Sequence, residues 1–66
     1  MEHKYQIYIY WSGEDDAFIA EVPELAGCEA EGQSYQEARA NIETAIQAWI
    51  RTAQDENRPL PKARWG

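Results

Sequence analysis

The sequence has few of the residues that mark secreted, metal-binding or membrane-spanning proteins. It contains one cysteine, Cys28, and one histidine, His3, so it cannot form an internal disulfide and has too few ligands for a usual zinc site. No run approaches the roughly 18 apolar residues of a membrane-spanning helix, and no signal-like apolar run follows the charged N-terminus. We therefore expect a soluble, cytoplasmic protein with no metal ion and no cofactor.

The chain is short and acidic, with 66 residues and a formal net charge of −6. This length predicts one small domain over residues 1–66, with a core that is marginal without an oligomer or a partner. Residues 1–33 contain eight acidic residues and one basic residue, a net charge of −7, whereas residues 34–66 carry +1. This charge argues against a chain that holds nucleic acid through its phosphates.

Three segments of the first half have the composition of β-strands. Residues 5–11 are β-branched and aromatic, residues 17–22 alternate between two faces, and residues 28–31 alternate small apolar and acidic side chains. Pro23 ends the second segment because it has no backbone N–H to donate to a neighbouring strand. The connections are short and polar, which favours an antiparallel meander.

The spacing of the apolar residues changes to three and four after Ser34. Ser34 and Glu37 form a capping box, which predicts the start of a helix that spans about residues 35–54. One apolar stripe runs along this helix and consists of Ala38, Ile42, Ala45, Ile46, Trp49, Ile50 and Ala53. Residues 58–66 contain two prolines and are predicted to be an extended tail, of which residues 62–66 form a loose end or a short fourth strand. The basic residues of this tail are candidates for contact with RNA or with a neighbouring subunit: Arg58, Lys62 and Arg64.

This order of elements predicts a two-layer α+β fold, in which one long helix covers one face of a three- to four-stranded antiparallel-type sheet. The other face is left without a helix and combines aromatic and acidic side chains, so it is a candidate contact surface. The candidate partner-binding residues on it are Tyr8, Tyr10, Ile19, Glu21, Glu29 and Glu31.

Self-association is also expected. A single helix leaves one sheet face open and the core is small, so we predict a homodimer or a higher homo-oligomer. Trp11, at the end of the first predicted strand, fits either half-burial or an oligomer contact.

A set of motifs is spread over most of the chain. The turn reads Pro23-Glu24-Leu25-Ala26-Gly27-Cys28, the helix start reads Gly32-x-Ser34 and then Glu37-Ala38-x-x-Asn41, and the exit reads Pro59-Leu60-Pro61. In this order and spacing the motifs resemble those of the HicB-like antitoxin family, over roughly residues 5–61. Four residues of the turn are interpreted as structural: Pro23 ends a strand, Leu25 enters the core, Gly27 adopts a backbone angle that a side chain disfavours, and Cys28 points inward.

The resemblance implies a partial ribonuclease-H-like fold without catalysis. It also implies an antitoxin that neutralises a small basic mRNA-cleaving toxin of the HicA type. Many members of the family add a C-terminal DNA-binding domain, and because this sequence ends at Gly66 we expect no direct DNA binding.

Two alternatives stay open at this point. One is an orphan self-assembling module of the same family that has no toxin. The other is a diminished ribonuclease-H-like nuclease that holds metal ions with Glu21, Glu29 and Glu31. We favour a binding protein over an enzyme, because no basic groove is predicted to hold a substrate. Cys28 also lacks a nearby histidine that would activate it as a nucleophile.

Overall fold

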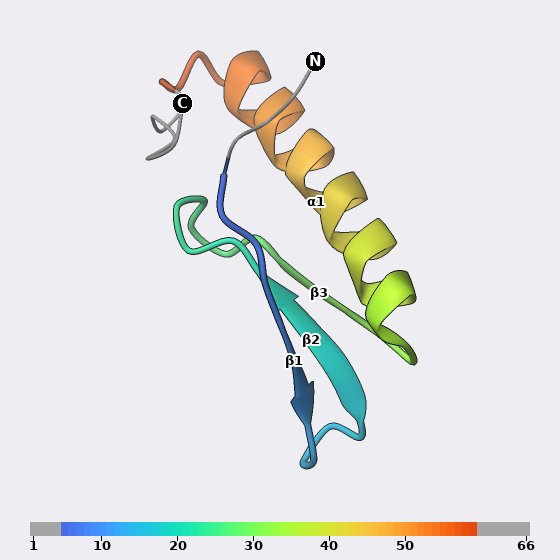
Figure 1. Cartoon of the computed structure of the whole chain (residues 1–66). Helices are drawn as coiled ribbons and strands as arrows, with labels where there is room; N and C mark the ends of the chain where they lie inside the picture. The colour runs from blue at the N-terminus through green and yellow to red at the C-terminus, as the bar shows by residue number, and fades with distance from the viewer. Residues whose placement is uncertain (1–4, 60–66) are drawn as a thin grey trace.

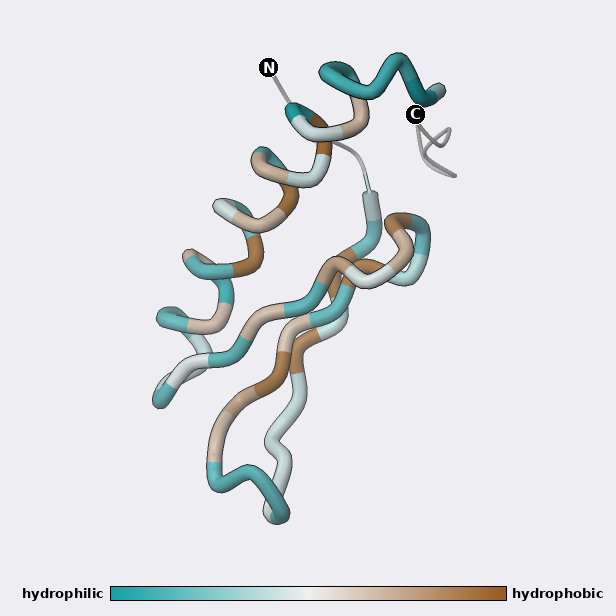
Figure 2. The backbone as a smooth tube through the Cα atoms, turned by 180° about the vertical axis from the view of Figure 1, so that it is seen from behind, coloured by the Kyte–Doolittle hydropathy of each residue, from teal (hydrophilic) through white to brown (hydrophobic). Residues whose placement is uncertain are grey.

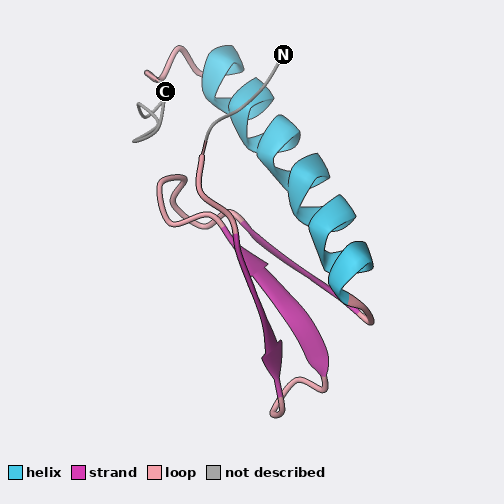
Figure 3. Ribbon diagram, viewed as in Figure 1, coloured by secondary structure: helices cyan, strands magenta, loops and turns pink. Residues whose placement is uncertain are grey.

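The computed structural model describes residues 5–59 as three strands followed by one long helix (Figure 1). The elements are β1 (Tyr8–Ser12), β2 (Ala17–Glu21), β3 (Glu29–Gly32) and α1 (Tyr35–Asp55). The strands form one antiparallel sheet in the order β1-β2-β3, and α1 lies against one face of it (Figure 3). The predicted α+β class is thus confirmed. The predicted fourth strand at residues 62–66 lies outside the described residues, as does the tail beyond Pro59.

The predicted start of the second strand at Ala17 was correct, but the other strand ends differ from the prediction by one to three residues. The loop between β2 and β3 explains the end of β2 and the starts of β1 and β3. The N–H of Val22 donates to the carbonyl of Cys28 at 3.1 Å, so Val22 closes this loop and β2 ends at Glu21. β1 therefore first pairs with β2 at Tyr8, not at Tyr5. The N–H of Cys28 is likewise used inside the loop, so β3 is shifted by one residue to Glu29–Gly32.

The core lies between α1 and the sheet. Figure 2 shows the hydrophobic segments of α1 on the side that faces the strands. The buried residues of this cluster are Ala20, Val22, Leu25, Cys28, Ala38, Ile42 and Ile46. Ile7, Ile9, Phe18, Ala30, Trp49 and Ile50 are partly buried against it, together with Tyr5 and Ala45. This arrangement agrees with the predicted apolar stripe, because the stripe supplies every helix residue of the cluster.

Both ends of α1 are capped. The N–H of Glu37 donates to the Ser34 Oγ at 3.1 Å, as the capping box predicts. The Glu37 carboxylate accepts from the N–H of Gln33 at 2.6 Å, one residue further back than the usual partner in this motif. At the other end Asn57 adopts a φ of 58°, and the N–H of Arg58 donates to the carbonyl of Ala53 at 2.8 Å. A left-handed residue followed by such a bond is a common way to end a helix.

Gly32 sets the distance between β3 and α1. Only Gln33 and Ser34 separate the two elements, so the end of the strand meets the first turn of the helix. A Cβ atom at Gly32 would lie 2.5 Å from the backbone nitrogen of Ala38 and 2.8 Å from the carbonyl carbon of Glu37. Because backbone atoms cannot move aside as a flexible side chain can, this position requires glycine.

We predict that Gly32→Ala destabilises the fold by about 1–3 kcal/mol, the usual effect of forcing extra volume into a packed site. Gly13→Ala is the matched control, because a Cβ at Gly13 meets nothing within 4 Å. Chemical denaturation followed by far-UV circular dichroism measures both free energies of unfolding. Equal stability of the two variants would show that α1 does not approach β3 this closely.

Candidate partner-binding face

The strand register brings the predicted partner-binding residues together on the side of the sheet away from α1. Two rows cross the three strands, one formed by Tyr8, Glu21 and Glu29 and the other by Tyr10, Ile19 and Glu31. The row between them, Ile9, Ala20 and Ala30, points to the helix and joins the core. Side chains alternate between the two faces of a strand, so the two rows share one surface, which we call the open face.

The open face is aromatic at one edge and acidic at the other. Tyr8 and Tyr10 on β1 are each 46% exposed, although both are large side chains. Glu29 and Glu31 on β3 are also exposed, whereas Ile19 and Glu21 on the central strand are half-buried between them. Exposed aromatic side chains beside charged ones are typical of contact surfaces.

Tyr10 and Glu21 are joined across the strands. The Tyr10 hydroxyl donates a hydrogen bond to the Glu21 carboxylate, diagonally across β1 and β2. This bond raises the pKa of Tyr10 above its ordinary value of 10.0, with smaller contributions from desolvation and from the negative charges of Glu21, Glu29 and Asp15. The bond orients the tyrosine ring along the open face.

Like charges stand next to each other on this surface. Glu21 and Glu29 are directly opposite on β2 and β3, and Glu31 follows two residues later on the same face. Directly opposed like charges destabilise a sheet, so the open face carries a repulsion that a bound cation would reduce. Within residues 5–59, no group of three or more histidine, cysteine, aspartate or glutamate side chains is arranged to hold a metal ion.

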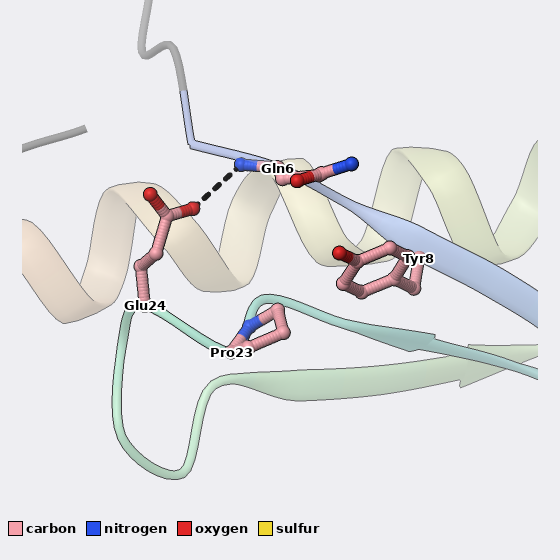
Figure 4. Close-up of a pocket in the computed structure, with 4 residues that line it drawn as sticks. All are labelled: Gln6, Tyr8, Pro23 and Glu24. Carbon is pink, nitrogen blue, oxygen red and sulfur yellow. Dashed lines mark hydrogen bonds between the residues drawn. The ribbon is translucent and has the colours of Figure 1, made fainter. Parts of the chain in front are cut away.

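The loop after β2 is held by its own backbone and by α1. The N–H of Leu25 donates to the carbonyl of Val22 at 3.0 Å, and Gly27 adopts a φ of 77°, which favours glycine. Leu25 is fully buried beneath the loop. The Glu24 carboxylate accepts from the N–H of Gln6 at 2.8 Å and so ties the loop to the segment before β1 (Figure 4).

Cys28 is buried at the end of this loop, as expected for a small core residue. Burial raises the pKa of its thiol. A raised pKa keeps the thiol protonated, which opposes a role as nucleophile.

Sequence reasoning assigned no role to two polar contacts that support the site. The Trp49 Nε1–H donates to the carbonyl of Ala26 at 2.9 Å, and this hydrogen bond holds the loop between β2 and β3 against α1. The Asn41 side-chain amide donates to the carbonyl of Glu31 at 2.7 Å and so holds β3 against α1. The one sequence signal for a role of Asn41 was its position in the motif Glu37-Ala38-x-x-Asn41. Its partner could not be found without knowing which strand lies beside the helix.

The sequence left the roles of Trp11 and Arg58 undecided, and the structure gives both side chains contacts within the chain. Trp11 is 53% exposed and packs edge to face on Phe18, its neighbour on β2, with ring centroids 5.2 Å apart. The Arg58 guanidinium lies 5.9 Å from the centroid of the Trp49 ring and 2.9 Å from the Glu56 carboxylate. Arg58 is therefore held against its own helix, while Lys62 and Arg64 lie outside the described residues.

Fold and surface together define a small α+β protein that presents one aromatic and acidic sheet face. Within residues 5–59 no helix has both the length and the apolar content needed to cross a membrane. A family model described as the HicB-like antitoxin of bacterial toxin–antitoxin systems matches residues 5–65. The chain belongs to this family.

Curated proteins of similar sequence support this assignment. The UPF0150 protein ssl0259 of Synechocystis sp. is 39% identical over 57 residues, which cover 86% of this chain and 77% of that protein. The UPF0150 protein Ta0767 of Thermoplasma acidophilum is 36% identical over 59 residues, which cover 89% of this chain and 84% of that protein. No solved structure matches the chain significantly.

The hydrogen bond between Tyr10 and Glu21 predicts a pH effect of definite sign. Because the pKa of Tyr10 is raised in the folded protein, the bond contributes stability below pH of about 10, and this contribution is lost as the pH rises through the folded pKa. NMR titration of the Tyr10 ring should give a lower pKa in Glu21→Gln than in the wild type. Glu31→Gln is the control and should leave the value nearly unchanged. An unchanged pKa in Glu21→Gln would contradict the assigned bond.

Proposed function

We propose that this chain is a non-catalytic antitoxin that binds a small, basic, mRNA-cleaving toxin of the HicA type through its open face. The family supports the antitoxin role in general. Charge supports a HicA-type toxin as the partner and the open face as the surface, because a toxin that binds RNA must present basic residues to its phosphate groups. The half of the chain that forms the sheet carries a net charge of −7.

One observation carries this proposal, namely the placement of Glu21, Glu29 and Glu31 beside two exposed tyrosines on a surface that α1 does not cover. Tyrosine side chains bury much area with little loss of conformational freedom, so Tyr8 and Tyr10 suit the role of anchors. The carboxylates suit the role of steering groups, which accelerate association with a basic partner at low salt. Lysine or arginine side chains of the toxin would also reduce the repulsion between Glu21 and Glu29.

The main competing interpretation is an enzyme that uses the same carboxylates with metal ions. It predicts that the purified protein cleaves RNA, DNA or a hybrid duplex with Mg²⁺ or Mn²⁺, and that Glu29→Gln or Glu31→Gln abolishes the cleavage. Our proposal predicts no cleavage by the wild type. Metal-dependent cleavage that is lost in these variants would replace the binding function with a nuclease.

Self-assembly is the second candidate function, and the composition of β1 favours it. Among the described residues 5–59, β1 is an edge strand, and its five residues, Tyr8–Ser12, include no proline and no charged residue. Natural edge strands are commonly protected by lysine, proline or a bulge, because an unprotected edge pairs readily with another strand. The β3 edge differs, because α1 reaches it through Asn41. We propose that two copies pair β1 with β1 in an antiparallel, two-fold arrangement.

For toxin binding, we predict that changing Glu29 and Glu31 to lysine slows association with the basic toxin at least about tenfold at low salt and flattens the salt dependence. Tyr10→Ala should act mainly on dissociation, as contact residues usually do. The matched control changes Glu14 and Asp55 to lysine, an identical change of charge away from the open face. Surface plasmon resonance measures both rates, and co-expression in cells should show relief of the growth arrest caused by the toxin.

Equal association rates of the open-face variant and the control would mean that the charge of the whole chain, and not this face, guides the encounter. If the wild-type chain does not relieve the growth arrest, the antitoxin function itself is wrong for that toxin.

For self-association, we predict a mass of at least twice 7.6 kDa at micromolar concentration by analytical ultracentrifugation. Trp11→Lys places a charge on the β1 edge and should shift the protein toward the monomer. The Glu29 and Glu31 lysine variant, which leaves β1 intact, should keep the wild-type mass. A monomeric wild type would contradict pairing through β1, and a monomeric open-face variant would move the interface to the open face.

A further inference from the structure

The hydrogen bond between Val22 and Cys28 reveals the direction of the backbone groups along β2. The N–H of Val22 donates to the carbonyl of Cys28 at 3.1 Å, and the two residues are opposite each other when the β2–β3 register is extended by one pair. Val22 thus directs its backbone groups to β3. Because successive residues of an antiparallel strand direct these groups to alternate sides, Glu21 and Ile19 direct theirs to β1.

The same alternation divides the residues of β1. Tyr8 and Tyr10 are the partners of those two residues, so their backbone groups bond within the sheet. Ile9 and Trp11 direct their N–H and C=O groups to the outer edge of β1. Among residues 5–59 no strand lies beyond this edge. The edge therefore offers two N–H donors and two carbonyl acceptors to another strand.

The side chains of Ile9 and Trp11 lie on the helix side of the sheet, where α1 leaves part of β1 uncovered. α1 lies mainly over β3 and β2. Ile9 is only partly buried, and Trp11 is 53% exposed beside Phe18. A second copy of the same edge complements this one, because antiparallel pairing sets Trp11 of each copy beside Ile9 of the other and covers both. Since β1 has no charged residue, no like charges meet across the two strands.

We propose that two copies pair in the register that sets Tyr10 opposite the partner's Tyr10, and that their two open faces thereby form one surface. The proposal deepens the self-assembly described above and rests on it. This register pairs all five residues of β1, whereas a two-fold axis at Ile9 or at Trp11 pairs only three of the five. A shift by a single residue would mismatch the backbone groups that point to the edge. The bond from Tyr10 to Glu21 holds the Tyr10 ring over β2, so the ring leaves the edge free.

The joined surface has an aromatic centre and acidic margins. Its central row runs through Glu31, Ile19 and Tyr10 of one copy and continues, in reverse order, from the partner's Tyr10. Neighbouring strands lie about 4.8 Å apart, so five strand spacings place the Glu31 residues of the two copies about 24 Å apart. The surface fits a partner whose apolar centre is flanked by two basic patches at about this separation.

Tyr10→Cys tests the register in the full chain. Opposed residues of a non-hydrogen-bonded pair have Cα atoms about 4.5 Å apart, which is within the range that a disulfide spans. In a glutathione redox buffer, most of the Tyr10→Cys protein should therefore become a species of twice 7.6 kDa on a non-reducing gel.

Tyr8→Cys is the matched control. Tyr8 is the same residue type on the same face and is equally exposed, at 46%, but in the proposed register it lies opposite the partner's Ser12. Tyr8→Cys should stay unlinked, as should the wild type with its buried Cys28, whereas the double variant Tyr8→Cys/Ser12→Cys should link. Efficient linkage of Tyr8→Cys alone, or none in Tyr10→Cys, would overturn the proposal.

Amide hydrogen exchange gives a second readout that leaves Tyr10 in place. The Ile9 N–H should exchange at least about tenfold more slowly in the wild type than in Trp11→Lys, because pairing engages this group only in the dimer. The Tyr10 N–H bonds within the sheet in either state and is the internal control, so its exchange should change less. Equal exchange of the Ile9 N–H in the two proteins would overturn the proposal.

These outcomes separate the register from the functions proposed above. A monomeric wild type contradicts self-assembly and the joined surface together, and leaves the antitoxin function to the growth-arrest assay. A dimer with a protected Ile9 N–H but no disulfide in Tyr10→Cys retains pairing through β1 and overturns this register. Linked Tyr10→Cys, unlinked Tyr8→Cys and a protected Ile9 N–H support the joined surface.

Discussion

The packing of α1 on one face of the sheet is the constraint on which the other features of this protein depend. Residues 5–59 form one long helix and one three-stranded sheet, so this helix covers a single face of the sheet. Gly32 lets β3 approach the first turn of the helix, and the Trp49 and Asn41 side chains hold the loop and β3 against it. These contacts determine which rows of the strands become core and which remain exposed.

The uncovered face gains its chemical character from the antiparallel register. The register places Glu21 opposite Glu29 and next to Tyr8, so the acidic and aromatic residues of three separate segments form one surface. Such a surface is costly for an isolated monomer, because like charges are adjacent and large aromatic rings stay in water. The same register places Tyr8 at the end of this surface, beside a pocket that Gln6, Pro23 and Glu24 also line.

The central part of the fold could be predicted because its signals are local. The alternation in β1 and β2 predicted which side chains share a face, and the spacing from Ala38 to Ile50 predicted the buried side of α1. The strand ends could not be predicted in this way. They depend on the bonds that join Val22 to Cys28 and Cys28 to Leu25, which divert both residues into the loop. The hydrogen bond of Glu24 with Gln6 spans 18 residues and that of Asn41 with Glu31 spans 10, so no local pattern predicts either one.

The amino-acid sequence alone specifies the order of the elements, the two faces of each strand, the acidic charge of the first half and the likeness to the HicB-like antitoxin family. Each of these depends on residue type and on spacing over a few positions, which the chain carries in any conformation. Long-range packing, by contrast, brings Tyr10 to Glu21, places Arg58 against Trp49, and gathers Gln6, Tyr8, Pro23 and Glu24 around one pocket. Those contacts join segments separated along the chain, and their geometry exists only after the sheet and α1 have packed.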